Sequence, residues 1–227
     1  MIGVLVLMKD NLTIIRPFGP TLMKVQLTIE TIEELIYLTD KLIKDKDREH
    51  WSNNNFSQIK DEIEIPIPLL IKQGLFNTFI THLHRYVDHC AQGLHGYNSI
   101  DHIAKCNVSR MWFNEMKSGE YMPVHDHMSC QISSVLYLKL PSNAIKRNIK
   151  YKEDLDGRIE FIDRSVSPIF LQSGQMSMFP EVGTMYIFPS NLLHTVYPFL
   201  GEGTRRSIAW NGVYSIENRN NEKKDNK

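Results

Sequence analysis

Apolar residues recur at helical spacing in two stretches of the first hundred residues. The first stretch is Thr31–Lys46, where Thr31 and Glu34 form a possible capping box at the start. The second stretch, Pro66–Gly93, begins with two prolines and ends at a glycine, as helices often do. Upstream of both, Leu12–Leu27 alternates apolar and polar residues around the turn signal Phe18-Gly19-Pro20. The pattern predicts an N-terminal hairpin followed by two helices.

From about Asn107 onward, the pattern changes to short alternating runs that are separated by glycine and proline. Seven of these runs predict strands: Ser109–Met116, Tyr121–His127, Ile132–Leu140, Arg158–Ile162, Thr184–Phe188, Leu193–Phe199 and Thr204–Tyr214. So many short strands in roughly 110 residues are typical of a sandwich or jelly roll. We therefore expect a mostly β fold with flanking helices. In this division, residues 1–106 form the hairpin and helices, residues 107–216 the barrel, and residues 217–227 a flexible tail.

At 227 residues and 26.4 kDa, the chain is long enough for one well-cored domain. The formal net charge is zero, so no overall electrostatic field favours nucleic acid or an anionic membrane. The three cysteines, Cys90, Cys106 and Cys130, include no CxxC pair and favour a reducing compartment. The apolar start, residues 1–8, is too short to span a bilayer and lacks the basic n-region of a secretory signal. We expect a cytoplasmic protein with no membrane or nucleic-acid partner.

Three histidines carry the chemistry that the sequence suggests. His125 and His127 are two residues apart on a predicted strand, so their side chains should point to the same face. Taken alone, such a pair also fits a polar surface turn. His194 lies on a later strand-like run that follows a turn at Gly183. Together, the three fit a metal that is held at one end of a barrel by three protein ligands, with open positions left for chemistry.

The order of several motifs resembles that of the 2-oxoglutarate/Fe(II)-dependent oxygenase superfamily. The resemblance covers about residues 107–215, and its closest branch is a group related to prolyl hydroxylases from marine bacteria and their phages. The motifs are Trp112-x-Asn114, Gly119-Glu120, Pro123-Val-His125-Asp-His127, Val135–Pro141, Gly183, Phe188-Pro-Ser190, His194-x-Val196-x-Pro198-Phe199 and Arg205–Asn211.

This resemblance implies a double-stranded β-helix, which is a small cupin-like jelly roll, with Fe(II) at its open end. It implies that 2-oxoglutarate chelates the iron and is decarboxylated to succinate while O2 is consumed and a prime substrate is oxidised. The expected activity is that of a dioxygenase, most simply a hydroxylase acting on a peptide or protein side chain. If the gene belongs to a phage, the enzyme would act in the host cytoplasm.

The chain departs from the superfamily pattern at His127, which stands where most members have an aspartate or glutamate. Imidazole is an acceptable iron ligand, and the compared branch resembles His-x-His, so we expect His127 to be a ligand. Asp126 should point to the opposite face of a regular strand. It remains an alternative third ligand, or a partner that orients an imidazole. A vacant third position, as in halogenases, is a further alternative.

Arg205 is the best candidate to hold the distal carboxylate of 2-oxoglutarate, because a guanidinium can bind a carboxylate bidentately. If residues 194–199 and 204–209 form a hairpin, His194 and Arg205 are offset by about four residues, or about 13 Å. A one-residue slip would substitute Arg206. The resemblance adds Ser207 and Tyr137 as further contacts to this carboxylate. Two asparagines could line the pocket near the iron: Asn114 and Asn211.

Two other function classes stay open at this point. One is a cupin-like three-histidine metalloenzyme that does not use 2-oxoglutarate, and it would need no arginine anchor on the last strand. The other is a jelly-roll module that binds a partner without catalysis. We do not expect the six other histidines to be metal ligands, and a basic segment over residues 146–152 is typical of a solvated loop. We expect the histidines of the second helix, His82, His84 and His89, to be solvated.

Overall fold

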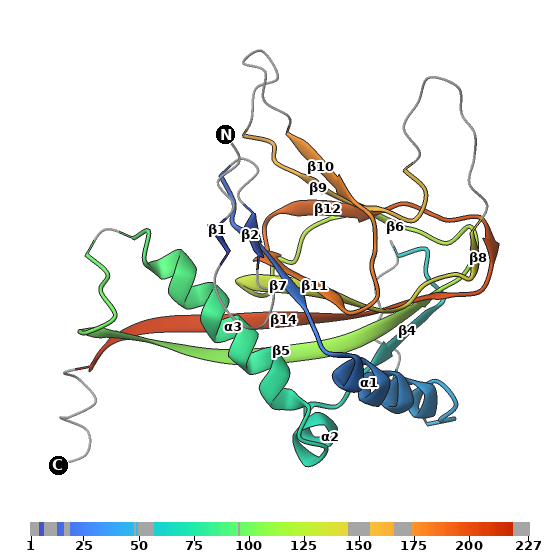
Figure 1. Cartoon of the computed structure of the whole chain (residues 1–227), viewed down its shortest axis with the longest axis horizontal. Helices are drawn as coiled ribbons and strands as arrows, with labels where there is room; N and C mark the ends of the chain where they lie inside the picture. The colour runs from blue at the N-terminus through green and yellow to red at the C-terminus, as the bar shows by residue number, and fades with distance from the viewer. Residues whose placement is uncertain are drawn as a thin grey trace.

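Two antiparallel sheets face each other (Figure 1), and the three histidines line the cavity between them. The computed structural model describes residues 5–6, 13–15, 19–47, 49, 57–94, 96–144, 155–165 and 174–219. The predicted turn at Phe18, the basic segment, most of the tail, and His50 and His95 lie outside these described residues. The mostly β jelly-roll fold that the sequence predicts is confirmed.

The larger sheet has eight strands in the order β1-β2-β3-β11-β7-β14-β5-β4. In chain order its strands are β1 (Leu5–Val6), β2 (Thr13–Ile15), β3 (Leu22–Gln26), β4 (Asp61–Glu64), β5 (His102–Met116), β7 (Ile132–Lys139), β11 (Thr184–Pro189) and β14 (Arg205–Asn218). The central strands β5, β7 and β14 are the long ones, and they form the floor of the site.

The smaller sheet has four strands in the order β10-β9-β12-β6. They are β6 (Met122–His125), β9 (Ile159–Ile162), β10 (Gln175–Met178) and β12 (Leu193–Val196). A separate pair joins β8 (Asn143–Ala144) to β13 (Gly201–Glu202). The smaller sheet forms the roof of the site and carries two of the three histidines.

Three helices lie outside the barrel: α1 (Ile29–Leu42), α2 (Ile67–Lys72) and α3 (Phe76–Ala91). The predicted capping box is wrong, because Thr28 caps α1 by accepting the backbone N–H of Thr31 at 3.4 Å. The second predicted helix is interrupted between α2 and α3. Gly74 adopts a φ of 75° there, which a residue with a side chain rarely does.

Side-chain alternation on the larger sheet produces two apolar layers. On one face, Phe113, Leu136 and Ile208 pack with residues of α1 and α3 in the main core. On the other face, Val135 and residues of β9 and β11 form a smaller core between the sheets. The central strands are therefore buried on both faces, and the helices close the side of the sheet away from the site. No helix in the described part of the chain is long and apolar enough to cross a membrane.

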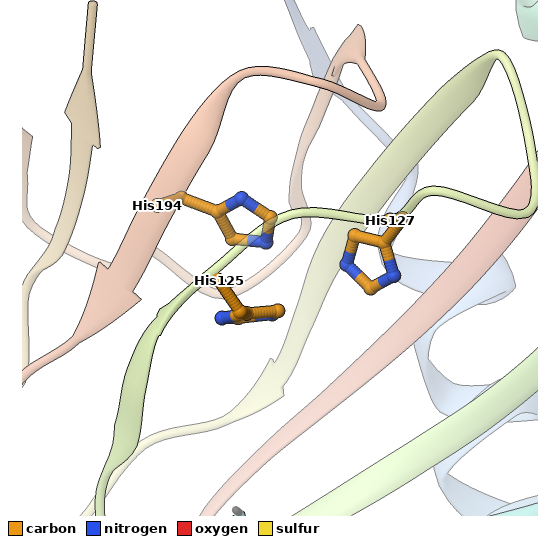
Figure 2. Close-up of side chains that lie close together, drawn as sticks. All are labelled: His125, His127 and His194. Carbon is orange, nitrogen blue, oxygen red and sulfur yellow. The ribbon is translucent and has the colours of Figure 1, made fainter. Parts of the chain in front are cut away.

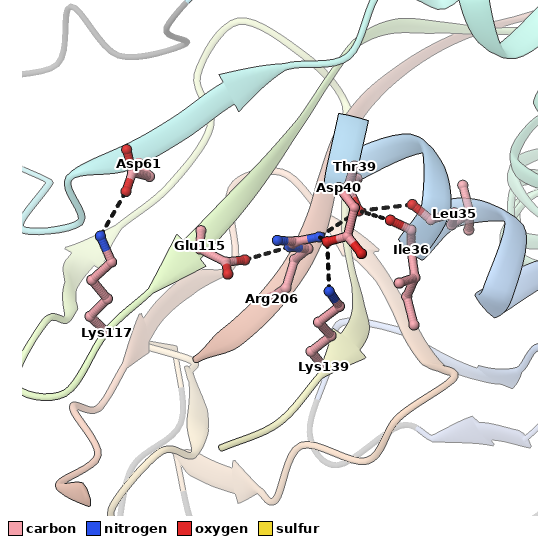
Figure 3. Close-up of polar contacts among 9 residues, drawn as sticks. All are labelled: Leu35, Ile36, Thr39, Asp40, Asp61, Glu115, Lys117, Lys139 and Arg206. Carbon is pink, nitrogen blue, oxygen red and sulfur yellow. Dashed lines mark hydrogen bonds and ion pairs between the residues drawn. The ribbon is translucent and has the colours of Figure 1, made fainter. Parts of the chain in front are cut away.

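Arg206 fastens α1 to the larger sheet through a cluster of ion pairs (Figure 3). Its guanidinium pairs with Glu115 on β5 and donates to Asp40 at 2.6 Å and to the Thr39 hydroxyl at 3.0 Å. Lys139 on β7 also pairs with Asp40, at 2.6 Å. This cluster lies on the face of β14 that the helices cover. The Arg206 side chain therefore points away from the cavity that contains the three histidines.

One sequence expectation about the strands is wrong, and one strand was missed. β12 and β14 do not form a hairpin, because β12 pairs with β6 and β9 whereas β14 pairs with β5 and β7. The chain crosses from one sheet to the other between them. Strand β4 was also not predicted from its sequence, Asp61-Glu-Ile-Glu64, since three of its four residues are acidic. Its pairing with β5 buries Asp61, Glu62 and Ile63 all the same.

Candidate metal and co-substrate site

The three histidines converge although they come from different positions in the fold (Figure 2). His125 is the last residue of β6 and lies directly opposite His194 on β12, with ring centroids 4.1 Å apart. His127 lies two residues after the end of β6, and its backbone N–H donates to the Ser190 carbonyl at 2.9 Å. Its ring centroid is 5.1 Å from that of His125 and 5.2 Å from that of His194. One nitrogen from each ring lies within 4.8 Å of the others.

Two of the rings are oriented by their own backbone. Nδ1 of His125 lies 2.8 Å from the Pro123 carbonyl oxygen, and Nδ1 of His194 lies 2.9 Å from the Leu192 carbonyl oxygen. Since a carbonyl can only accept, each Nδ1 carries the hydrogen and donates it. In this tautomer the lone pair of each ring is on Nε2, which is the form of imidazole that binds a metal through that atom.

Burial keeps the three imidazoles neutral. It lowers the pKa of His125, and it lowers the pKa of His127 to about 4, with a further contribution from His125. The pKa of His194 is held well below its ordinary value by burial and by the two neighbouring histidines. At neutral pH the cluster therefore offers three uncharged nitrogen ligands, a set suited to iron and other first-row metals.

Asp126 does not join this cluster. Among the described residues, the three histidines form the only group of three or more possible metal ligands, and their ligand atoms lie within 4.8 Å of one another. The Asp126 carboxylate lies at the same cavity, where its charge acts to raise the pKa of His125 but is outweighed by burial. The structure thus places His127, and not its neighbour, beside the other two rings.

A cavity of about 470 Å³ lies between the two sheets, with the histidines in its wall. Arg205, the first residue of β14, lines it and is only 2% exposed. Its guanidinium lies 4.9 Å from the centre of the Tyr137 ring, and one of its nitrogens donates to the Gly157 carbonyl at 3.2 Å and weakly to the Met116 sulfur at 4.0 Å. Its Nε finds no hydrogen-bond partner among the described residues. A buried cation with unused donors is suited to receive an anion.

Two further polar side chains accompany Arg205. Ser207 lies two residues along the same face of β14, directly opposite Tyr137 on β7. The Tyr137 hydroxyl is fully buried and has no hydrogen-bond partner among the described residues. Burial raises the pKa of this phenol against the opposing effect of Arg205, so it stays protonated and able to donate. Arg205, Ser207 and Tyr137 are brought together, as the sequence predicts.

The two predicted asparagines also line the cavity. Asn114 on β5 lies opposite Ser207, and Asn211 on β14 lies opposite Arg110. Sequence reasoning missed several other polar residues of the wall, among them Arg110 and Ser133. The available signal was alternation, since each lies an even number of residues from a predicted cavity residue on the same strand: Arg110 from Asn114, and Ser133 from Tyr137.

The remaining histidines stay apart from this site. His82 on α3 is 7% exposed, so the expectation that it is solvated is wrong. His84 and His89 on the same helix are half-buried. None of the other described histidines belongs to the group of possible metal ligands formed by His125, His127 and His194.

Fold and site together define a class: a double-stranded β-helix with a buried three-histidine cluster at one end of its cavity. Residues 110–211 match the family described as putative 2OG-Fe(II) oxygenases. This matched segment contains all three histidines and Arg205, and it is the region whose motif order predicted the 2-oxoglutarate/Fe(II)-dependent oxygenase superfamily. The match and the three-histidine cluster support a 2-oxoglutarate-dependent oxygenase with Fe(II) as its metal and with 2-oxoglutarate and O2 as co-substrates.

Solved structures share the fold at low sequence identity. A prolyl-4-hydroxylase from Pseudomonas putida is 15% identical with a TM-score of 0.53, over 84% of this chain and 91% of that one. A prolyl hydroxylase from Trichoplax adhaerens, in complex with a hypoxia inducible factor peptide fragment, is 12% identical with a TM-score of 0.53, over 89% and 84%. A viral collagen prolyl hydroxylase from Paramecium Bursaria Chlorella virus-1, in its 2OG complex, is 14% identical with a TM-score of 0.50, over 85% and 96%. Comparison with curated proteins gave no match.

Proposed function

We propose that His125, His127 and His194 bind the Fe(II), that Arg205 binds the distal carboxylate of 2-oxoglutarate, and that the enzyme hydroxylates a prime substrate with release of succinate and CO2. The observation that carries the proposal is the placement of Arg205. It is a buried guanidinium with an unpartnered Nε, in the same cavity as three neutral imidazoles.

The chain's own residues suit both groups. Three neutral imidazoles leave the full divalent charge of the metal to be balanced by its other ligands, which favours an anionic co-substrate. Arg205 offers the second positive charge at a distance along the cavity, with Tyr137 and Ser207 beside it to donate hydrogen bonds. When bound, the iron and 2-oxoglutarate supply the activation of O2. The two sheets exclude bulk water from the buried end of this cavity, where Arg205 and Tyr137 lie.

Arg205 also separates the proposal from its alternatives. A three-histidine enzyme that does not use 2-oxoglutarate needs no buried cation at the far end of the cavity. A non-catalytic binding module needs neither that cation nor three imidazoles whose lone pairs converge. We further propose that the enzyme acts in the cytoplasm, in that of the host if the gene is carried by a phage. The three free thiols, Cys90, Cys106 and Cys130, support this location.

Turnover without a prime substrate tests the proposal. The purified protein is supplied with Fe(II), 2-oxoglutarate, O2 and a reductant, and succinate is measured. We expect slow succinate release that requires iron and is lost in His194→Ala and Arg205→Ala. Lys105→Ala, which removes an exposed cation that pairs with Glu217, is the matched control and should release succinate at the wild-type rate. Release that persists in Arg205→Ala would contradict the assigned role.

A further inference from the structure

A row of four side chains crosses the larger sheet beneath the histidine cluster. The register places Phe188 on β11 opposite Ser133 on β7, Ser133 opposite Asn211 on β14, and Asn211 opposite Arg110 on β5. His194 packs edge-on against Phe188, with ring centroids 4.9 Å apart, so this row lies next to the cluster. Ser133, Asn211 and Arg110 are called the polar row below.

The polar row is separate from the place assigned to 2-oxoglutarate. Asn211 lies six residues along β14 from Arg205, which is about 20 Å in a strand. The next row toward Arg205 presents Trp112, Ala209 and Val135, and Trp112 lies 5.9 Å from the His127 ring. The histidine cluster therefore lies between a cationic end of the cavity and a second polar end.

Two side chains of the polar row are buried with an oxygen that has no hydrogen-bond partner among the described residues. Ser133 is 1% exposed and Asn211 is 3% exposed, and both line the cavity. The Ser133 hydroxyl and the Asn211 amide oxygen make no hydrogen bond with any described residue. Buried polar atoms are normally paired, and leaving them unpaired destabilises the fold. Their arrangement is explained if a ligand supplies the missing partners.

We infer that the polar row binds the prime substrate through an amide group that has a carboxylate nearby. This inference rests on the proposed function. An asparagine side chain presents one acceptor and one donor, which match the N–H and C=O of an amide, and the serine hydroxyl can serve either. Arg110, exposed at the outer end of the row, provides the charge for a carboxylate. An acidic residue in a peptide and a free N-acyl amino acid both have this chemistry.

The polar row favours a substrate with an amide and a carboxylate over two other classes of substrate, hydrocarbons and nucleic acids. A purely hydrocarbon substrate would leave the Ser133 and Asn211 oxygens unpaired in the complex as well. A nucleic acid would require several phosphate contacts, whereas the row has a single cation and the chain carries no net positive charge.

The first part of the test is the stability of the metal-free protein. Asn211→Leu replaces an amide whose buried oxygen is unpaired by an apolar side chain of similar size, so the melting temperature should stay the same or rise. If Asn211 were a structural residue, the same change would lower the melting temperature. Asn107→Leu, at an exposed asparagine on β5, is the matched control for surface effects.

The second part measures binding to the anaerobic protein loaded with Fe(II) and 2-oxoglutarate. The probes are N-acetyl-glutamate, N-acetyl-lysine, capped decapeptides rich in glutamate or in lysine, and a single-stranded DNA oligonucleotide. We expect at least one glutamate probe to bind about tenfold more tightly than its lysine counterpart. Asn211→Leu should weaken that binding about tenfold, and Arg110→Gln should remove most of the charge preference. Lys105→Gln is the control for loss of one exposed cation on the same strand.

The visible absorption of the iron–2-oxoglutarate complex is recorded in the same samples. It shows whether a negative result counts against the proposed function or only against the role of the polar row. If the complex forms but no glutamate probe binds, or Asn211→Leu binds the probe as wild type does, the inference is overturned and the proposed function stands. Preferential binding of the oligonucleotide would also overturn it. If the complex does not form, the proposed function fails and the inference falls with it. Binding of the peptide but not of the free amino acid, or the reverse, supports the inference and identifies the source of the amide.

Discussion

His125 and His194 lie directly opposite each other on β6 and β12, and each is held by the same local contact. In both, Nδ1 donates to the carbonyl of the residue two positions earlier, at 2.8 Å and 2.9 Å. The strands thus fix the direction of both Nε2 lone pairs before any metal arrives. His127 completes the cluster from the loop that follows β6. The geometry supports a preorganised site in which each histidine can be tested separately.

Replacement of His194 tests the metal ligands that lie on strands. His194→Ala leaves two imidazoles, and we expect the affinity for Fe(II) to fall by at least about 100-fold, more than is typical for loss of an outer partner of a ligand. The metal-free variant should keep its circular dichroism spectrum. Iron titration under anaerobic conditions measures both. A variant that binds iron as wild type does would contradict the three-histidine site.

His127 stands where related sites carry a carboxylate, so two substitutions distinguish its role. His127→Asp supplies an anionic ligand at the same position and should retain iron, because carboxylate and imidazole are both accepted by Fe(II). His127→Ala should lose most of the affinity. Equal iron affinity in His127→Ala and wild type would instead point to Asp126 or to a two-ligand site.

Replacing the two neighbouring arginines of β14 should affect different properties: co-substrate binding for Arg205 and fold stability for Arg206. Arg205→Ala should raise the 2-oxoglutarate concentration needed for half-maximal turnover by at least about 100-fold, the scale of a lost charge-assisted pair, and change iron affinity little. Arg206→Ala leaves Glu115 buried without its cation and should destabilise the fold by about 3–5 kcal/mol. Denaturant titration and steady-state kinetics separate the effects. If Arg206→Ala remained stable and raised the 2-oxoglutarate requirement, Arg206 and not Arg205 would point into the cavity, and the assignment of the two faces of β14 would be wrong.

The depressed histidine pKa values predict how stability of the metal-free protein depends on pH. Burial lowers the pKa of His127 from 6.5 to about 4, so between these values the unfolded state binds the proton more readily than the folded state. Stability should therefore be full above pH 6.5 and fall as the pH drops toward about 4, by on the order of 3 kcal/mol for this residue. Denaturant unfolding at a series of pH values measures the fall. In His127→Ala the slope over this range should be shallower, and an unchanged slope would contradict the assignment.

The sequence alone was sufficient to predict the fold class, and it predicted which site residues share a face of a strand. Alternation predicted seven strands that the structure contains, and it placed Arg205 and Ser207 on one face with Arg206 on the other. Pairing between strands could not be read in the same way. Adjacency along the chain suggested a hairpin between β12 and β14, whereas the chain crosses to the other sheet there.

Residues whose environment depends on distant partners were the hardest to predict. Glu62 is 3% exposed only because β4 pairs with β5, a contact that an acidic stretch does not suggest. Similarly, the polar row depends on the register of four strands: alternation can place Ser133 and Asn211 at the cavity, but it cannot show that they are neighbours across β7 and β14. His127 lies beyond the end of β6, and its approach to the other rings depends on the backbone bond to Ser190.

The most direct measurement is the visible spectrum of the protein with Fe(II) and 2-oxoglutarate in the absence of oxygen. If His125, His127 and His194 hold the iron and Arg205 anchors the co-substrate, a metal-to-ligand charge-transfer band should appear, and it should fade with release of succinate when oxygen is admitted. Arg205→Ala should need far more 2-oxoglutarate to produce the same band. Iron binding without any band would contradict the account and favour a three-histidine enzyme that does not use 2-oxoglutarate.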